Sequence, residues 1–387
     1  MKKICVITGT RAEYSLLKPI IDKINNEDEL KVQIIATGMH LSPEFGLTYK
    51  EIESDGYEIS EKIEILLSSD TTVGISKSMG LAMISFSECY ARLKPDLIIV
   101  LGDRYEMFSA VSAAMISRIP VAHLHGGEST EGLVDEAIRH SITKMSYLHF
   151  TSTEEYRNRV IQLGEAPERV FNVGAIGIEN IKNTKFLSKE ELVNQINFNL
   201  GDKFAIVTFH PVTLDSSLAE EQFSNVLSAL DSFNDLDIIF TKANADTEGR
   251  IINQMIDEYV KKNSHRTISF TSMGKLRYLS AVKYASVVIG NSSSGIIEVP
   301  ELKVPTVNIG DRQKGRVLSE SIINCNANKC EIIDAIKKSL DNNFTQTLQN
   351  TTHPYGDGEV SSKVVSVIKS YLLDNKIDIK KHFYDLR

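Results

Sequence analysis

Short apolar, β-rich runs alternate with helical stretches through most of this chain, and this alternation constrains the fold most strongly. The first series of expected strands covers residues 3–8, 32–36, 97–101, 121–125, 148–151 and 170–173. A polar connector rich in Asn and Lys follows over residues 174–202. The alternation restarts at residue 204 and ends with an expected strand over residues 306–309, and the asparagine cluster over residues 324–328 is expected to be a loop. Strands separated by helices form open parallel sheets. The restart therefore predicts an α/β protein made of two successive doubly wound units.

Two acidic motifs follow neighbouring strands of the first series. Residues 97–101 run into Gly102-Asp103-Arg104, and residues 120–125 run into Gly126-Gly127-Glu128. Ligands of open α/β sheets bind beyond the carboxyl ends of the strands. We therefore expect Asp103 and Glu128 to project into one crevice, where paired carboxylates can perform acid–base chemistry. The alternative is structural, with Asp103 capping the next helix and Glu128 lying in a solvated loop.

A turn of small residues in the second series suits an anion. Gly290-Asn-Ser-Ser-Ser-Gly295 follows an expected strand and leads into a helix that carries Glu298. Small residues allow backbone N–H groups to approach an anion, and the helix N-terminus adds partial positive charge. The serine hydroxyls add donors, and Glu298 is placed to bind the two hydroxyls of a ribose. The motif is not a Walker loop, because no Gly-Lys-Ser/Thr follows; a simple helix cap remains the alternative.

Two further strand ends carry candidate binding residues. Gly9-Thr10-Arg11 follows the first strand with a similar layout, and Arg11 is expected to face the crevice and meet a diphosphate. His210-Pro211 ends the strand over residues 204–209. A lone histidine is usually a hydrogen-bonded structural residue, but its place at a strand end beside a proline turn favours a role in the site.

The histidines of the second acidic motif permit another interpretation. His123 and His125 share one face of a strand, and with Glu128 they could form a zinc site. Against a metal hydrolase, His123 lies inside the expected strand and no third histidine motif follows. Gly126-Gly127 instead indicates close approach of the backbone to a ligand.

Composition excludes some functions. The net charge of −8 over 387 residues argues against a nucleic-acid binder, which needs a broad basic face, although local arginines can still hold an anionic small molecule. The four cysteines form no Cys-x-x-Cys pair, which favours buried free thiols in a reducing cytosol: Cys5, Cys89, Cys325 and Cys330. The N-terminal apolar stretch ends at Gly9, too early for a signal peptide or a membrane span, so we expect a cytoplasmic protein with no membrane partner.

Several motifs occur in the order known from one protein family: Gly102-Asp-Arg-Tyr-Glu106, His123-Leu-His-Gly-Gly-Glu128, Asp135-Glu-Ala-Ile-Arg139, His210-Pro211, Gly290-Asn-Ser-Ser-Ser-Gly295 and Gly310-Asp-Arg-Gln-Lys-Gly-Arg316. On these motifs the chain resembles the UDP-N-acetylglucosamine 2-epimerases, over nearly its whole length and least in the connector and after Ile323. It looks most like the hydrolysing branch, which makes N-acetylmannosamine for bacterial sialic acid synthesis. Non-hydrolysing relatives typically show Pro-Glu-Glu where this chain has Val134-Asp135-Glu136.

The resemblance implies two Rossmann-like doubly wound domains in a glycosyltransferase-B arrangement, with the active site in the interdomain cleft. Residues 1–175 together with 368–387 would form the N-terminal domain with the catalytic acids, and residues 176–367 the C-terminal nucleotide-binding domain. A C-terminal helix would cross back to the first domain. The family also implies a UDP-sugar substrate and UDP product, no cofactor, no metal, and a homodimer or homotetramer.

By the same resemblance, catalysis would rest on Asp103, Glu128, Asp135 and His210. The residues that would bind the nucleotide sugar are Arg11, Ser15, Arg104, Asn244, Ser292, Ser293, Glu298 and Arg312.

The implied reaction eliminates UDP across C1–C2 of UDP-N-acetylglucosamine to give a glycal, which water then converts to N-acetylmannosamine. The C2 proton has no adjacent carbonyl, so we expect departure of UDP to run ahead of proton loss, with carboxylates stabilising the cationic ring. Glu128 and Asp135 are expected to handle the C2 proton and the hydration. One alternative substrate is UDP- or GDP-2,4-diacetamido-2,4,6-trideoxyglucose of legionaminic acid synthesis. An alternative of another class is a non-catalytic regulator that only binds a nucleotide sugar. Asp103, Glu128 and Asp135 count against it, because a protein that only binds an anion gains nothing from carboxylates buried nearby.

Overall fold

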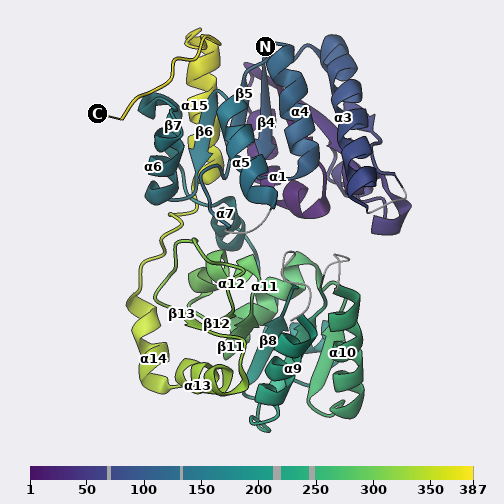
Figure 1. Cartoon of the computed structure of the whole chain (residues 1–387), viewed down its shortest axis with the longest axis vertical. Helices are drawn as coiled ribbons and strands as arrows, with labels where there is room; N and C mark the ends of the chain where they lie inside the picture. The colour runs from purple at the N-terminus through teal and green to yellow at the C-terminus, as the bar shows by residue number, and fades with distance from the viewer. Residues whose placement is uncertain (68–70, 131–133, 212–218, 244–248, 387) are drawn as a thin grey trace. The chain divides into compact units, whose positions relative to one another are not determined.

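The computed structural model describes residues 1–67, 71–130, 134–211, 219–243 and 249–386, which form two compact units (Figure 1). The first unit contains Met1–Glu128, Val134–Asn180 and Tyr355–Arg387, and the second contains Ser129–Leu133 and Ile181–Pro354. The chain returns to the first unit at Tyr355, earlier than the expected residue 368, because Val360 and Val364 already lie in its core. Each unit is built on a wholly parallel sheet with helices on both faces, which confirms the predicted pair of Rossmann-like doubly wound units.

The sheet of the first unit has the strand order β3-β2-β1-β4-β5-β6-β7. Its strands are β1 (Lys2–Thr8), β2 (Leu30–Thr37), β3 (Glu61–Ile63), β4 (Leu97–Leu101), β5 (Val121–Leu124), β6 (Leu148–Thr151) and β7 (Val170–Asn172). The helices are α1 (Arg11–Asn25), α2 (Tyr49–Ser54), α3 (Thr72–Leu93), α4 (Tyr105–Ile116), α5 (Val134–Met145), α6 (Glu154–Gln162), α7 (Ile176–Lys182) and α15 (Val360–Leu373). Three short 3-10 turns lie at Gly38–Leu41, Pro43–Phe45 and Pro167–Arg169.

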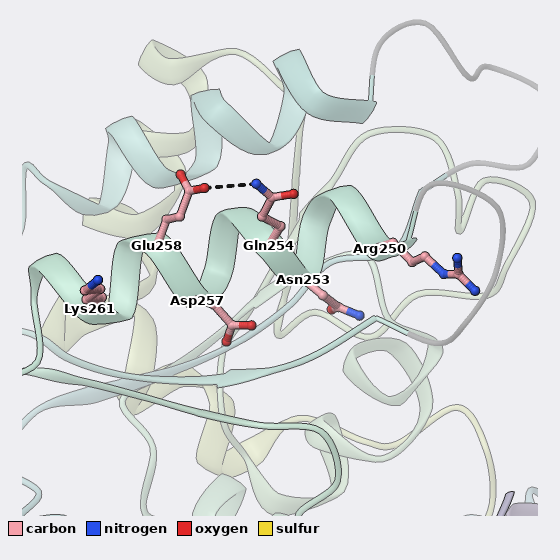
Figure 2. Close-up of a pocket in the computed structure, with 6 residues that line it drawn as sticks. All are labelled: Arg250, Asn253, Gln254, Asp257, Glu258 and Lys261. Carbon is pink, nitrogen blue, oxygen red and sulfur yellow. Dashed lines mark hydrogen bonds between the residues drawn. The ribbon is translucent and has the colours of Figure 1, made fainter. Parts of the chain in front are cut away.

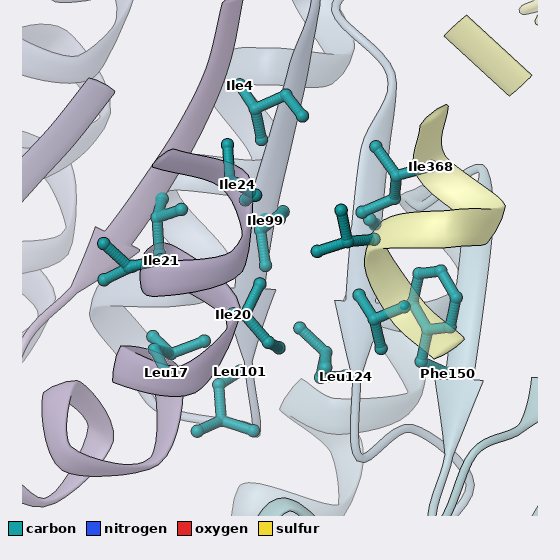
Figure 3. Close-up of a cluster of buried hydrophobic side chains, with 14 of the residues drawn as sticks. Ile4, Leu17, Ile20, Ile21, Ile24, Ile99, Leu101, Leu124, Phe150 and Ile368 are labelled. Atoms are coloured by element: carbon teal, nitrogen blue, oxygen red, sulfur yellow. The ribbon is translucent and has the colours of Figure 1, made fainter. Parts of the chain in front are cut away.

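Alternate residues of β1 fill two different cores, as the period of a strand requires. Ile4 and Val6 pack with α1 and α15 on one face of the sheet, whereas Cys5 and Ile7 pack with α3 and α4 on the other. Figure 3 shows the first core, in which Ile368 of α15 and the isoleucines of α1 lie on the same face of the sheet. Each such buried side chain contributes about 1.5–3 kcal/mol. The expected return of a C-terminal helix to the first unit is thereby confirmed.

The sheet of the second unit has the order β10-β9-β8-β11-β12-β13. Its strands are β8 (Phe204–Thr208), β9 (Asp237–Thr241), β10 (Thr267–Phe270), β11 (Val287–Gly290), β12 (Thr306–Ile309) and β13 (Ile322–Cys325). The helices are α8 (Lys189–Ile196), α9 (Ala219–Leu230), α10 (Gly249–Lys262), α11 (Gly274–Tyr284), α12 (Ser293–Ile297), α13 (Lys329–Ser339) and α14 (Asn342–Thr347), with 3-10 turns at Val299–Leu302 and Leu348–Asn350. One face of the sheet is covered by α9, α10 and α13, and the other by α8 and α11.

Two local expectations were wrong. The asparagine-rich segment from Asn324 was expected to be a loop, but Asn324 and Cys325 lie in the edge strand β13, where parallel pairing with β12 overrides a composition typical of turns. Cysteines were expected to be buried, and Cys5 and Cys89 are, whereas Cys330 is exposed on the first turn of α13. No described helix is long and apolar enough to cross a membrane.

Gly290 should be among the least replaceable residues of the second sheet. It ends β11 with φ of 136°, and a Cβ there would lie 1.8 Å from the carbonyl oxygen of Thr208 on β8. Because both the backbone conformation and the space exclude a side chain, we expect Gly290→Ala to lower the free energy of unfolding by at least about 3 kcal/mol. Denaturant titration measures this change.

Gly80 provides the matched control. It lies exposed within α3, and a Cβ there would meet nothing within 4 Å. Gly80→Ala should therefore raise the free energy of unfolding by about 0.5–1 kcal/mol. Equal effects of the two substitutions would contradict the argument from packing.

Candidate active site

In each sheet the strand order reverses between two neighbouring strands, β1 and β4 in the first unit and β8 and β11 in the second. The crevice outside the carboxyl ends of such strands is where doubly wound sheets bind ligands. Asp103 follows β4, and His210 and Ser292 follow β8 and β11. Most of the predicted site residues therefore lie at the ligand-binding edge of their own sheet.

A buried arginine organises the acids of the first unit. Arg139 of α5 is 2% exposed, and its Nε donates to Asp103 Oδ2 over 2.9 Å while its Nη2 contacts the same oxygen. Its Nη1 donates to Glu136 Oε2 (3.1 Å) and to the carbonyl oxygen of Glu128 (2.8 Å). One guanidinium thus fixes the ends of two strands and the start of a helix, and balances the charge of two carboxylates. We call these four residues the Arg139 cluster.

Glu128 is brought back towards β5 by the two glycines before it. Gly127 has φ of 80°, and a Cβ there would lie 2.3 Å from the carbonyl oxygen of Tyr156, so only glycine fits this turn. The Glu128 carboxylate is buried, and its Oε1 accepts from His125 Nδ1 (2.8 Å) and from Ser152 Oγ (3.2 Å). Glu128 is therefore a held, buried carboxylate and not a solvated loop residue. Asp135, by contrast, lies exposed in the first turn of α5.

His123 is a structural residue of β5. It is fully buried, with Nε2 bonded to the carbonyl oxygen of Gly102 (2.7 Å) and Nδ1 to Thr143 Oγ1 (3.1 Å). Burial lowers the pKa of the imidazole to about 3, so the ring is neutral at physiological pH. Both nitrogens of His123 are thus occupied, which leaves no position for a metal. In the described part of the chain, no group of three or more His, Cys, Asp and Glu could hold a metal ion.

The turn after β1 is closed by its own carboxylate. Thr10 and Glu13 form a capping box, in which Glu13 Oε2 accepts from the N–H of Gly9 (2.7 Å) and of Thr10 (3.0 Å). Burial, followed by the proximity of Glu106, raises the pKa of Glu13 to about 7. Glu106 is buried and accepts from Arg104 Nε over 2.5 Å. The backbone N–H groups of this turn are therefore occupied, and Arg104 is held in place from behind by Glu106.

The two candidate nucleotide contacts on α1 differ in their surroundings. The Arg11 side chain is 44% exposed and lies 3.6 Å from Glu51 of α2. The carbonyl oxygen of Ser15 accepts from Asn180 Nδ2 over 2.9 Å, and Ser15 itself is partly buried. The ion pair between Arg11 and Glu51 is solvated and therefore weak.

In the second unit, Asn291 ties together the ends of three strands. Its side chain accepts from the His210 N–H (2.8 Å) and donates to the His210 carbonyl oxygen (2.7 Å). Its own carbonyl oxygen accepts from Arg312 Nη1 (3.0 Å) and Gln313 Nε2 (2.8 Å). This network positions His210 and Arg312 together at the carboxyl ends of β8, β11 and β12.

His210 is neutral in this setting. Burial, followed by the charge of Arg312, lowers the pKa of its imidazole to about 4. Its Nδ1 is buried and has no hydrogen-bond partner within the described residues. A neutral imidazole beside an arginine can bind a phosphate or a leaving oxygen without adding a second positive charge.

The serine turn is partly engaged in its own structure. Ser292 caps α12, and Ser294 Oγ donates to Glu298 Oε2 (2.5 Å) while it accepts from the hydroxyl of Tyr278 (3.0 Å). Burial raises the pKa of Glu298, which the hydrogen bond from Ser294 partly offsets. Ser292, Ser293 and Ser294 are all partly buried, and Ser292 Oγ accepts from the N–H of Ser294 over 3.4 Å.

Two hollows of the second unit lie apart from most of these residues. One of about 370 Å³ is lined by the loop from Gly310 to Arg316 and by β13. The other, of about 440 Å³, lies along α10, where Figure 2 shows Arg250 to Lys261 projecting from the same helix. Neither contains a predicted site residue among its lining residues. Asn244, expected to contact the nucleotide, lies outside the described residues.

His125 was considered from the sequence only as a possible zinc ligand. The residues that hold the site together and were given no role from the sequence are Glu13, Glu106, Arg139, Asn291 and Gln313. Thr10-Arg-Ala-Glu13 carries the spacing of a capping box, which is a readable signal. Arg139 gives no such signal, because an arginine within a helix is usually solvated. Its role arises only from packing that brings α5 beside the ends of β4 and β5.

Loss of Arg139 should be costly to the first unit. Arg139→Met removes the cation and leaves Asp103 and Glu136 without it, so we expect the free energy of unfolding to fall by about 3–5 kcal/mol. Lys18→Met is the control, because Lys18 and Asp22 form a half-exposed pair within α1. The control should lose no more than about 0.5 kcal/mol in the same urea titration. Similar losses for both variants would show that Arg139 is not an organising residue.

His123 should make stability depend on pH. The folded protein keeps this ring neutral down to a pKa of about 3, whereas the unfolded chain protonates it at the ordinary histidine value. The free energy of unfolding should therefore fall as the pH drops below about 6.5, by about 1.4 kcal/mol per pH unit from this residue alone. His123→Gln should remove that part of the slope between about pH 6 and pH 5.

The exposed His265 is the control for this measurement. Urea titrations of His265→Gln should show the wild-type slope of stability against pH. A His123→Gln slope equal to that of wild type would show that His123 is not held neutral.

Known proteins are similar to this chain over its whole length. The model of a family described as UDP-N-acetylglucosamine 2-epimerase matches residues 22–369. The chain is 45% identical over 386 residues to GDP/UDP-N,N'-diacetylbacillosamine 2-epimerase (hydrolyzing) from Campylobacter jejuni, covering 100% of this chain and 99% of that protein. It is 41% identical over 387 residues to polysialic acid biosynthesis protein P7 from Escherichia coli, covering 100% of this chain and 98% of that protein.

The fold is shared with a solved structure. The crystal structure of UDP-GlcNAc 2-epimerase from Neisseria meningitidis bound to UDP-GlcNAc superposes with a TM-score of 0.79 and 18% sequence identity. The match covers 96% of this chain and 100% of that one. At this level of identity the likeness concerns the fold.

Proposed function

The chain belongs to the hydrolysing branch of the UDP-N-acetylglucosamine 2-epimerase family, and we propose that it converts nucleotide-linked N,N'-diacetylbacillosamine and water to the free 2-epimer and the nucleoside diphosphate. This sugar is the 2,4-diacetamido-2,4,6-trideoxyglucose considered above as an alternative. The Campylobacter jejuni relative named for it is 45% identical over essentially the full length of both chains. The observation that carries the chemistry is the Arg139 cluster, in which one buried cation binds the carboxylate of Asp103 after β4 and the backbone carbonyl oxygen of Glu128 after β5.

The carboxylates suit a reaction that passes through a cationic sugar. Departure of the nucleoside diphosphate from C1 leaves positive charge on the ring, and fixed negative charges stabilise it without reorganisation. Asp103 is suited to this task, because Arg139 holds its Oδ2 from behind and keeps the side chain oriented. Loss of the C2 proton then completes the glycal, and addition of water at C1 with proton return at C2 gives the 2-epimer.

The second unit supplies groups suited to the leaving diphosphate. Arg312 is positive, His210 is neutral, and Ser292 and Ser293 are only partly buried. A diphosphate gains negative charge as the C1–O bond breaks, so an arginine beside a hydrogen-bonding imidazole favours its departure. Engagement of one substrate by both units remains a prediction from the sequence, as do the roles of Arg11, Ser15, Arg104, Asn244 and Glu298 as nucleotide contacts. The catalytic use of Asp135 and a homo-oligomeric state are likewise proposals.

The second candidate substrate is UDP-N-acetylglucosamine, which would make N-acetylmannosamine for sialic acid synthesis. The family description and the 41% identity to polysialic acid biosynthesis protein P7 favour it. The two sugars differ at C4 and C6, remote from the bonds that break. The same acids therefore serve either substrate, and the choice rests on the residues around C4 and C6.

Product analysis tests the proposal. The protein is incubated in heavy water with UDP-N,N'-diacetylbacillosamine, its GDP counterpart, or UDP-N-acetylglucosamine, and the products are identified by NMR. We expect turnover with one diacetamido substrate, release of nucleoside diphosphate, and one solvent deuterium at C2 of the 2-epimer, because the elimination exchanges that proton.

The controls separate the candidates. Turnover of UDP-N-acetylglucosamine at a kcat/KM at least about ten-fold higher than that of either diacetamido substrate would favour the second candidate, since ten-fold corresponds to about 1.4 kcal/mol. Release of nucleotide with hydrogen retained at C2 would exclude elimination. An absence of turnover with all three compounds would favour a non-catalytic binder.

A further inference from the structure

We propose that His125 takes the proton from C2 of the sugar and that Glu128 holds its imidazole in place. This assignment deepens the proposed function and depends on it. It also reverses the role expected for Glu128, which becomes a positioning residue for the histidine. The observations are the hydrogen bonding, the burial and the backbone conformation of His125 at the carboxyl end of β5.

The contact with Glu128 fixes which ring nitrogen carries hydrogen. His125 Nδ1 lies 2.8 Å from Glu128 Oε1, and Ser152 Oγ donates to that same oxygen from 3.2 Å. An ionised carboxylate only accepts hydrogen bonds, so the proton of a neutral His125 sits on Nδ1. The lone pair is then on Nε2, the nitrogen that faces away from Glu128 and can receive a proton.

Nε2 of His125 has no partner among the described residues, although it is buried. His123, two residues earlier and within β5, has both ring nitrogens bonded. A buried polar atom left without a hydrogen bond costs about 1–3 kcal/mol, and native proteins retain few of them. The contrast between the two histidines indicates that His123 serves the structure, whereas Nε2 of His125 is kept for a ligand.

The backbone of His125 has a positive φ, which most residues other than glycine avoid. Its φ is 63°, in the left-handed region that only a few per cent of non-glycine residues adopt. The N–H of His125 extends the sheet by donating to the carbonyl oxygen of Phe150 (2.9 Å), and Gly126-Gly127 then turns the chain so that Glu128 meets the ring. Strain of this kind is concentrated at functional sites.

Burial distinguishes the two members of the pair. The side chain of His125 is 16% exposed, and that of Glu128 is 6% exposed. Glu128 Oε1 already accepts two hydrogen bonds, from His125 and from Ser152. The arrangement matches a base whose far nitrogen is oriented by a buried carboxylate, as in acyl-transfer triads. Glu128 would then stabilise the imidazolium that forms.

The C2–H proton moves to His125 Nε2, and the electron pair of that bond forms the C1–C2 double bond. The C1–O bond breaks, and its electron pair leaves with the nucleoside diphosphate oxygen. Inversion at C2 then requires a proton delivered from the opposite face of the ring, so a different acid must complete the hydration.

The variant His125→Asn tests whether His125 acts as the base or only donates a hydrogen bond to Glu128. Asn tolerates a left-handed backbone, and its side-chain N–H can still donate to Glu128, but it has no group in place of Nε2. We expect kcat on the substrate identified above to fall by about 10²–10⁴-fold, with KM changed only a few-fold and deuterium entry at C2 slowed in parallel. A kcat within about ten-fold of wild type would show that donation to Glu128 is all that His125 provides.

Ser152→Ala is the matched control, because it removes the other donor to Glu128 Oε1 and leaves His125 in place. We expect it to lower kcat by no more than about ten-fold, the equivalent of one neutral hydrogen bond. A loss as large as that of His125→Asn would overturn the proposal in favour of Glu128 as the base. If His125→Asn lowers the melting temperature, His125→Gln replaces it under the same criteria.

The activity of the wild type separates a failure of the His125 assignment from a failure of the proposed function. Turnover by the wild type with activity retained in the His125 variants overturns this inference alone. Absence of turnover by the wild type overturns the proposed function and this inference with it.

Discussion

Parallel pairing of strands is the constraint on which the arrangement of this protein depends. In a parallel sheet every strand ends at the same edge, so the residue that follows each strand meets the residues that follow its neighbours. Pairing of β1 with β4 and of β4 with β5 places Gly9, Asp103 and His125 at one edge of the first sheet. Pairing of β8 with β11 and of β11 with β12 does the same for His210, Ser292 and the loop that carries Arg312. Residues about a hundred positions apart in the sequence become neighbours because hydrogen-bond ladders align their strands.

Titratable side chains lie near the carboxyl ends of the strands in both units. The residues packed around each side chain decide whether it is ionised. Arg139 is buried with its guanidinium on Asp103, Glu136 and the backbone of Glu128. Burial without an acidic partner keeps His123 and His210 neutral. Glu13 follows the same rule, because burial beside Glu106 raises its pKa to about 7 and so favours its neutral form. The proposed reaction produces an anionic leaving group and a cationic sugar, and it needs such separation of charged from neutral groups, since a uniform field would favour only one of the two.

Much of the fold and part of the site were predictable from the sequence. The strands over 97–101, 148–151 and 306–309 were predicted with the bounds that the structure has, because buried parallel strands are continuous apolar runs with turn residues at their ends. Asp103, Glu128 and His210 were singled out because they follow such runs. Asn324 shows the limit of this reasoning, since the edge strand β13 is less apolar and its composition indicated a loop. Arg139 and Asn291 were missed for another reason: their partners are chosen by packing between elements.

The sequence by itself determined that this chain forms two parallel α/β units, which residues stand at their strand ends, and to which family it belongs. These properties follow from local hydrophobic periodicity, turn residues and the order of motifs along the chain. Only the tertiary structure decided that both ring nitrogens of His123 are hydrogen-bonded. In His125, one nitrogen is bonded to Glu128 and the other has no partner among the described residues. The two histidines look alike in sequence, being two positions apart on one expected strand. They differ because desolvation and hydrogen bonding are set by the atoms around each ring, and those atoms come from distant parts of the chain.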